Sequence, residues 1–245
     1  MVLDRPIRPP PRATQPKSMK GITLALTIVV ASHNEGKLAE IRRILVEDLA
    51  GAPIELVSAG SLGLPDPVET GVTFQENALL KARFVAQRSG MPAIADDSGL
   101  IVDVMGAAPG ILSARWAGEH GNDAANNELL LKQIADIPDD KRTARFRCAA
   151  ALAVPGPGAD ADGLHPIVSD HVEIGEMPGR IIRKPRGEHG FGYDPLFVPD
   201  DQPARASGGP ELTSAEMSAD EKNAISHRGK ALKALVPAIA QLVTR

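Results

Sequence analysis

The segment that decides the fold class is "TIVVASHNEGK", residues 27–37. It completes an apolar run that begins at residue 21, and such continuous apolar character is typical of a strand buried on both faces. The polar loop is followed by "KLAEIRRILVEDLA", in which apolar residues recur at helical spacing: Leu38, Ile41, Leu45 and Leu49. A strand, a polar loop and a helix form the start of an α/β unit, so the sequence predicts an α/β fold.

The rest of the chain also mixes strands with helices. Extended segments are predicted at residues 54–60, 93–95, 100–105, 143–155 and 167–177. The last two of these are expected to form a long antiparallel pair joined by a surface loop. Helices are predicted at residues 73–90 and 122–138 and, after a junction, through residues 218–243. Thr73 with Glu76 and Ser218 with Glu221 have the spacing of capping boxes, which mark helix starts.

Composition restricts the partners and the compartment. The formal net charge is −4, which gives no general field for DNA or RNA and argues against a nucleic-acid partner. Cys148 is the single cysteine, so no internal disulfide can form, and no Cys/His cluster has zinc spacing. No apolar run approaches the roughly 18–20 residues of a membrane span. We therefore expect a cytoplasmic protein that does not bind membranes, with residues 1–20 as a disordered, proline-rich extension and residues 21–245 as one domain.

The loop "SHNEGK", residues 32–37, is a candidate phosphate site. Backbone N–H groups at a helix start attract anions, and Lys37 adds a positive charge. A Walker A loop would need glycine at position 31 and serine or threonine at position 38, where this chain has Ala31 and Leu38. The P-loop interpretation therefore fails, and the alternative to phosphate binding is a capped helix with a surface lysine.

Carboxylates that could bind a metal lie in two segments. "IADDSG" places Asp96 and Asp97 directly after a predicted buried strand, where unpaired carboxylates are costly, and oxygen ligands suit Mg²⁺. "ETG" places Glu69 just before a predicted helix, with Asp66 nearby. The alternatives are a polar turn for the first segment and an ordinary loop carboxylate for the second.

Two later segments contain residues suited to binding a nucleotide. In "GEHGFGYDP", glycines surround Phe191, which could stack on a base, and Asp194, which could accept hydrogen bonds from a base or ribose. In "EKNAISHRGK", Lys222 and Arg228 could hold phosphate, and His227 could bond a purine oxygen. The alternatives are a turn with buried aromatic residues and a solvated basic helix face.

Six segments occur in an order and spacing that point to one known family: "VVASHNEGKLAEI", "ETGVTFQENALLKA", "AIADDSGLIVDVMGAAPGILSARWAG", "RFRCAAALA", "GFGYDPLF" and "AEMSADEKNAISHRGKAL". Over residues 26–240 the chain resembles the inosine/xanthosine triphosphate pyrophosphatase family. The resemblance implies Mg²⁺-dependent hydrolysis of XTP, ITP and dITP to the monophosphate and pyrophosphate, by a cytoplasmic homodimer. It also implies an elongated mixed-sheet fold with two lobes around a nucleotide-binding cleft.

The resemblance assigns roles to residues by position. The matched triphosphate loop consists of Ser32, His33, Asn34, Glu35, Gly36 and Lys37. Ser32, Asn34 and Lys37 would lie nearest the phosphates, and His33 has no specific role. Asp97 matches the proton acceptor and metal ligand, and Ser98 matches a substrate contact. The residues matched on the base side and beyond are Phe191, Gly192, Tyr193, Asp194, Lys222, His227 and Arg228. Glu69 is the expected second metal ligand, with Asp66 and Asp96 as alternatives.

Two alternative functions remain open at this point. One is a pyrophosphatase for other modified nucleotides, pyrimidines included. The other is a nucleotide-binding sensor without turnover, against which the adjacent Asp96 and Asp97 argue.

Overall fold

The computed structural model describes residues 25–32, 35–49, 53–202 and 208–243. Its strands are β1 (Leu26–Val30), β2 (Ile54–Ser58), β3 (Ala93–Val102), β4 (Thr143–Pro155), β5 (Ile167–Ile181) and β6 (Phe197–Pro199). Its α-helices are α1 (Glu35–Asp48), α2 (Phe74–Ser89), α3 (Asp123–Gln133), α5 (Ala219–Ile225) and α6 (His227–Val243). A short 3₁₀ segment, η3 (Gly110–Arg115), lies between β3 and α3.

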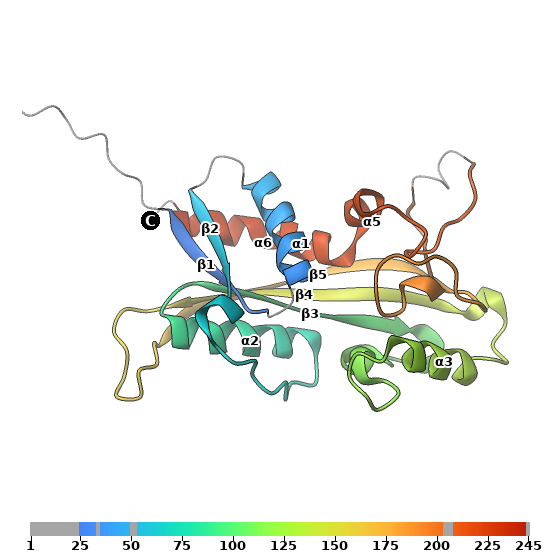
Figure 1. Ribbon diagram of the computed structural model, residues 1–245, viewed down its shortest axis with the longest axis horizontal. Coiled ribbons are helices and arrows are strands. Elements are labelled where there is room, and N and C mark those ends of the chain that lie inside the picture. Colours follow the sequence, from blue (N-terminus) through green and yellow to red (C-terminus); the bar gives the residue numbers. More distant parts are fainter. Residues whose placement is uncertain (1–24, 33–34, 50–52, 203–207, 244–245) are drawn as a thin grey trace, which may run out of the picture.

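The six strands form one mixed sheet in the order β2-β1-β3-β4-β5-β6. β1 pairs in parallel with β2 and β3, and the remaining neighbours are antiparallel. β4 and β5 are the longest strands, with 13 and 15 residues, and they run the length of an elongated molecule (Figure 1). The expected elongated mixed-sheet α/β fold is therefore confirmed, as is the long antiparallel pair.

β3 differs from its prediction. Extended segments are predicted at residues 93–95 and 100–105, with the polar "DDSG" segment between them, but a single strand of ten residues runs through this segment. The reason is its partner, because β4 pairs with it without interruption from Ala93↔Ala153 to Val102↔Ala144. Neighbouring side chains in a strand point to opposite faces of the sheet, so the Asp96 and Asp97 side chains lie on different faces.

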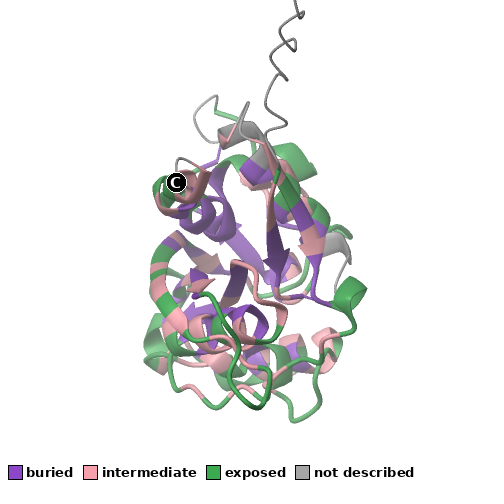
Figure 2. Ribbon diagram, turned by 90° about the vertical axis from the view of Figure 1, so that its left-hand side faces the viewer, coloured by how far each residue is buried: buried purple, intermediate pink, exposed green. Residues whose placement is uncertain are grey.

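Helices cover both faces of the sheet (Figure 1). α1 and α6 pack on one face against Ile28, Ile94 and Cys148, and α2 packs on the other face against Ala93, Ala149 and Ala151. Buried residues gather on the central strands and on the helix sides that face them (Figure 2). The alanine-rich segment of β4 has close helices on both sides, which explains its small side chains.

The helix starts follow the predicted caps in part. Ser218 and Glu221 form a complete capping box at α5. At α2, the Thr73 hydroxyl accepts from the Glu76 amide at 3.1 Å, but the Glu76 carboxylate accepts from the amide of Val72 instead. The final helical region divides at Ser226, whose extended backbone separates α5 from α6, and the predicted 122–138 helix ends early, at Gln133.

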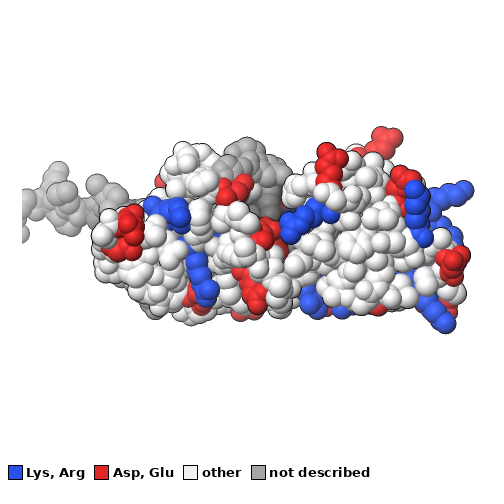
Figure 3. Space-filling model, turned by 90° about the horizontal axis from the view of Figure 1, so that it is seen from below, with Lys and Arg blue, Asp and Glu red and all other residues white. Residues whose placement is uncertain are grey.

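No helix in the described ranges is long and apolar enough to cross a membrane. On the face that carries α2 and α3, basic and acidic side chains are interspersed, without a broad region of one sign (Figure 3).

Candidate active site

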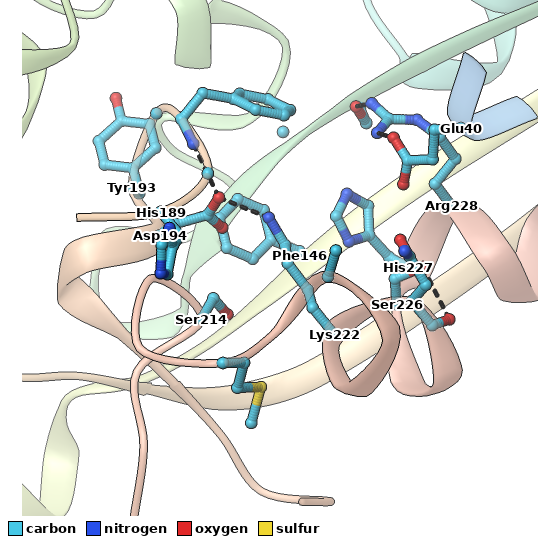
Figure 4. Close-up of a pocket in the computed structure, with 18 of the residues that line it drawn as sticks. Glu40, Phe146, His189, Tyr193, Asp194, Ser214, Lys222, Ser226, His227 and Arg228 are labelled. Carbon is cyan, nitrogen blue, oxygen red and sulfur yellow. Dashed lines mark hydrogen bonds and ion pairs between the residues drawn. The ribbon is translucent and has the colours of Figure 1, made fainter. Parts of the chain in front are cut away.

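A cavity of about 890 Å³ lies on the α6 face of the sheet. Its walls come from α1, from β3 at Ser98, from the segment of residues 189–194, and from α5 and the start of α6 (Figure 4). Beside the cavity, β1 pairs with β3 only as far as Val30↔Ile94, and the next bridge joins Ile101 to Pro109. Residues 95–100 of β3 therefore have no neighbouring strand on this edge among the described residues. A ligand in the cavity can therefore approach this edge of β3.

The segment of residues 189–194 forms one wall and presents an aromatic ring. The Phe191 side chain is 64% exposed, and the ammonium of Lys222 lies 5.3 Å from its ring centroid. The buried Asp194 accepts from the Phe191 amide at 2.9 Å and from Lys222 at 2.5 Å. Gly190 is required here, because a Cβ at its position would lie 2.1 Å from the Asp194 carboxylate. The structure thus brings Lys222 against Phe191 and against Asp194, which is 28 positions away in the sequence.

Tyr193 belongs to the same wall, but its hydroxyl is engaged in a hydrogen bond within the protein. Its hydroxyl donates to the carbonyl of Ser113 at 3.0 Å, and burial, with a contribution from Asp123, raises the pKa of this phenol. Tyr193 therefore remains a neutral side chain that fixes the loop to η3.

His227 is a buried, neutral imidazole at the start of α6. Its ring stacks on Phe146 with the centroids 5.0 Å apart and the planes 15° from parallel. Burial, and then the charges of Arg228 and Lys222, hold the pKa of His227 well below its usual value. Its Nδ1 atom is buried without a hydrogen-bond partner among the described residues. A neutral ring has one donor and one acceptor nitrogen, so a ligand group can complete this pairing.

Arg228 lies between two carboxylates. Its Nε is 3.1 Å from the Asp96 carboxylate, its Nη1 is 2.6 Å from the Glu40 carboxylate, and its Nη2 donates to the Ser98 hydroxyl at 3.4 Å. Burial alone would lower the pKa of Arg228, but Asp96 and Glu40 raise it above the usual value. Asp96 is therefore engaged with Arg228, which makes it a poorer candidate for a metal ligand than Asp97. α6 can approach so closely because Gly175 of β5 has no side chain; a Cβ there would lie 2.1 Å from the His227 carbonyl.

On the opposite face, a second cluster joins Glu69, Lys81 and Asp97. The Lys81 ammonium donates to Glu69 at 2.7 Å and to Asp97 at 3.2 Å, and the Asn77 amide donates to the other Asp97 oxygen at 3.3 Å. Burial raises the pKa of Asp97; Lys81 opposes this shift and Glu69 adds to it. Burial by itself lowers the pKa of Lys81, but the carboxylates, Asp97 first, raise it overall. The cluster is thus a pair of carboxylates held together by one ammonium group.

These two carboxylates can be tested as a magnesium site. Mg²⁺ in nucleotide enzymes is held by one or two carboxylates, substrate phosphates and water. Glu69 and Asp97 fit this requirement, because both contact the same ammonium nitrogen and their side chains are 28% and 14% exposed. Within the described residues, no group of three or more His, Cys, Asp or Glu side chains could hold a metal by itself. Asp66 lies in the same loop as Glu69 and is exposed.

The predicted triphosphate loop is described only in part. Ser32 is buried directly after β1, and α1 begins at Glu35. His33 and Asn34 lie outside the described residues, as do the side chains of the next three positions, including Lys37.

Two cluster residues, Asn77 and Lys81, were missed by the sequence interpretation. A signal for them exists in "ENALLKA": they stand four residues apart and therefore on one face of α2. The Asn77 amide oxygen also accepts from the Gly71 amide at 2.8 Å, which ties the Glu69 loop to the same helix face.

Comparisons with known proteins converge on one family. Residues 28–238 match the family model described as the Ham1 family. A dITP/XTP pyrophosphatase of Bifidobacterium longum subsp. infantis is 69% identical, with 89% of this chain and all of the relative covered. One of Streptomyces coelicolor is 51% identical, with 88% and 98% covered.

Solved structures agree. A dITP/XTP pyrophosphatase of Mycobacterium abscessus has 45% identity and a TM-score of 0.66, with 87% of this chain and 100% of that chain covered. A HAM1 protein of Coxiella burnetii has 38% identity and a TM-score of 0.71, with 88% and 99% covered.

Proposed function

The chain belongs to the Ham1 family, and on that premise we propose that it hydrolyses the non-canonical purine nucleoside triphosphates XTP, ITP and dITP to the monophosphate and pyrophosphate. This activity would remove such nucleotides before polymerases incorporate them into DNA or RNA. One observation carries the proposal: a cavity with an exposed aromatic residue reaches Ser98 on β3, beyond the last pair with β1, and the preceding residue, Asp97, belongs to a carboxylate–lysine cluster.

The proposed reaction uses residues of β3, α2 and the loop before α2. Glu69 and Asp97 would hold Mg²⁺, which supplies neutralisation of phosphate charge when bound. The Asp97 carboxylate orients a water molecule and takes its proton. Lys81 lies 3.2 Å from Asp97, so its ammonium is placed to stabilise charge on the departing pyrophosphate, together with Lys37. Arg228 is already paired with two carboxylates, so we assign it the positioning of Ser98.

Base recognition is proposed to occur in the cavity. The purine stacks on Phe191, as aromatic rings do with bases. Neutral His227 then donates a hydrogen bond to the 6-oxo group, which xanthine and hypoxanthine carry and adenine lacks. Guanine shares this oxo group but adds a 2-amino group, and burying it unpaired costs about 1–3 kcal/mol.

The deciding experiment measures pyrophosphate release from XTP, dITP, GTP and ATP, with Mg²⁺ and with EDTA. We expect metal-dependent release from XTP and dITP only. Asp97→Asn should abolish release, while the control Asp103→Asn, just beyond the end of the same strand, should retain it. A protein that binds XTP but releases no pyrophosphate would be the sensor, and faster turnover of modified pyrimidine triphosphates would establish the other alternative.

Assembly and location are part of the same proposal. We propose a homodimer, to be tested by light scattering; in its support, Val68 and Val72, on either side of Glu69, are 81% and 77% exposed. We propose the cytoplasm as its location, because its substrates belong to the cytoplasmic nucleotide pool. Residues 21–245 would act as one catalytic domain.

A further inference from the structure

The loop that carries Phe191 is held by helix α3, whose Asp123 also lines the cavity. The Asp123 carboxylate accepts from the Gly192 amide at 2.6 Å, and the Asn127 side-chain amide donates to the Gly192 carbonyl at 2.9 Å. Residues four apart lie on one side of a helix. Asp123 and Asn127 therefore bind both backbone groups of the residue that directly follows Phe191.

The N-cap of α3 is Asn122, so Asp123 does not cap the helix and its carboxylate can bind the Gly192 amide. The Asn122 side chain accepts from the Ala125 amide at 3.1 Å, which is the capping interaction of α3. The helix is itself anchored, since the Asn126 side chain accepts from the Ala117 amide at 2.7 Å and Leu130 is fully buried. α3 is thus a fixed support to which the loop is attached.

The loop needs such a support to hold an aromatic ring in place. Gly187, Gly190 and Gly192 all have positive φ angles, a conformation that glycine adopts but does not prefer, so the free loop has many alternatives. Packing does not fix the Phe191 ring, which is 64% exposed. Hydrogen bonds hold the backbone on either side of the ring: the clamp on Gly192 from α3, the bond from the Phe191 amide to Asp194, and the bond from the Tyr193 hydroxyl to Ser113.

We propose that Asp123 and Asn127 are positioning residues that hold Phe191 where a purine base can stack on it. The inference rests on the proposed function for the identity of the ligand. Asp97 lies on another element and has no contact with the clamp among its described hydrogen bonds. Loss of the clamp should therefore weaken nucleotide binding and leave the chemical step unchanged.

The kinetic test compares three variants on α3. Asp123→Ala should raise KM for XTP about tenfold, the equivalent of one hydrogen bond to a charged acceptor, with kcat within about twofold of wild type. Asp123→Asn keeps an acceptor oxygen and should recover most of the loss. Glu128→Ala removes an exposed carboxylate from the same helix and should change neither constant.

A double-mutant cycle separates positioning from direct contact. If Asp123 acts through the ring, Asp123→Ala should have no further effect on KM in a Phe191→Ala background. If the two effects add fully, the proposal is overturned, because Asp123 would then act independently of the ring.

Hydrogen exchange of the nucleotide-free protein tests the clamp without turnover. Asp123→Ala and Asn127→Ala should both speed amide exchange in a peptide covering residues 187–194, while Glu128→Ala should not. Unchanged exchange in the first two variants rejects the clamp. A wild-type protein that releases no pyrophosphate rejects the proposed function instead, so the two failures are distinguishable.

Discussion

Replacing Lys81 with methionine gives the most informative perturbation of the carboxylate–lysine cluster. The substitution keeps an unbranched side chain one atom shorter and removes the charge and both hydrogen bonds, at 2.7 Å to Glu69 and 3.2 Å to Asp97. Charge-assisted bonds contribute about 1.5–3 kcal/mol each, and the 13% and 14% exposure of the Lys81 and Asp97 side chains leaves little room for water to replace them. We expect kcat/KM for XTP to fall about 10- to 100-fold.

Two further measurements make this prediction specific. Without the ammonium, a divalent cation no longer competes with Lys81 for the two carboxylates, so Mn²⁺ should bind the nucleotide-free variant more tightly in calorimetry. The free energy of unfolding in urea should fall by about 1–3 kcal/mol, less than for a fully buried pair because the Glu69 side chain is 28% exposed.

Arg83→Met is the matched control for Lys81→Met. Arg83 lies on the same helix and pairs with Asp170, but its side chain is 47% exposed. The Arg83→Met variant should therefore lose about 1 kcal/mol or less in free energy of unfolding and keep its activity. A Lys81→Met enzyme with wild-type kcat/KM and weaker Mn²⁺ binding would refute the role given to this lysine.

Three further predictions concern the cavity. Arg228→Met should lower the free energy of unfolding by about 3–5 kcal/mol in urea titrations, because Asp96 and Glu40 lose a buried partner; a loss below about 1 kcal/mol would contradict this. Stability should fall as the pH drops below 6.5, because the depressed pKa of His227 means that the unfolded chain binds more protons. His227→Gln should remove the part of the pH dependence of the unfolding free energy that comes from this histidine, at most about 1.4 kcal/mol per pH unit. Phe191→Ala should raise KM about 5- to 100-fold with an unchanged melting temperature, because its exposed ring contributes stacking and little packing.

Local signals in the sequence predicted the elements well. The strand, loop and helix at the start of the described chain, and the capping box of Ser218 and Glu221, depend on residues a few positions apart. Such patterns can be interpreted without knowing what packs against them. The division at Ser226 could not be located to the residue, because it depends on where α6 meets β5 at Gly175.

Non-local pairing explains why the two extended segments predicted at residues 93–95 and 100–105 form one continuous strand. Asp, Ser and Gly are turn residues, and by local preference "DDSG" predicts a turn. β4 supplies an uninterrupted antiparallel partner to this segment, and a ladder of backbone hydrogen bonds outweighs a local preference. The partner lies about fifty residues later in the chain (Asp97 pairs with Ala149), and its alanine-rich composition gave no sign of which strand it would join.

The continuous strand also affects the chemistry. In a polar turn, Asp96 and Asp97 could both face one metal, and Asp96 is one of the alternative metal ligands that the sequence leaves open. In a strand they must separate: Asp96 turns to Arg228 on the α6 face, and Asp97 turns to Lys81 on the α2 face. The edge of β3 beyond its last pair with β1 lies between these two faces, and in our proposal a nucleotide with its base at Phe191 crosses that edge to reach Asp97. The strand geometry thus gives the two adjacent carboxylates different partners: Asp96 pairs with the arginine beside the cavity, and Asp97, which we propose as the catalytic residue, pairs with the lysine on the other face.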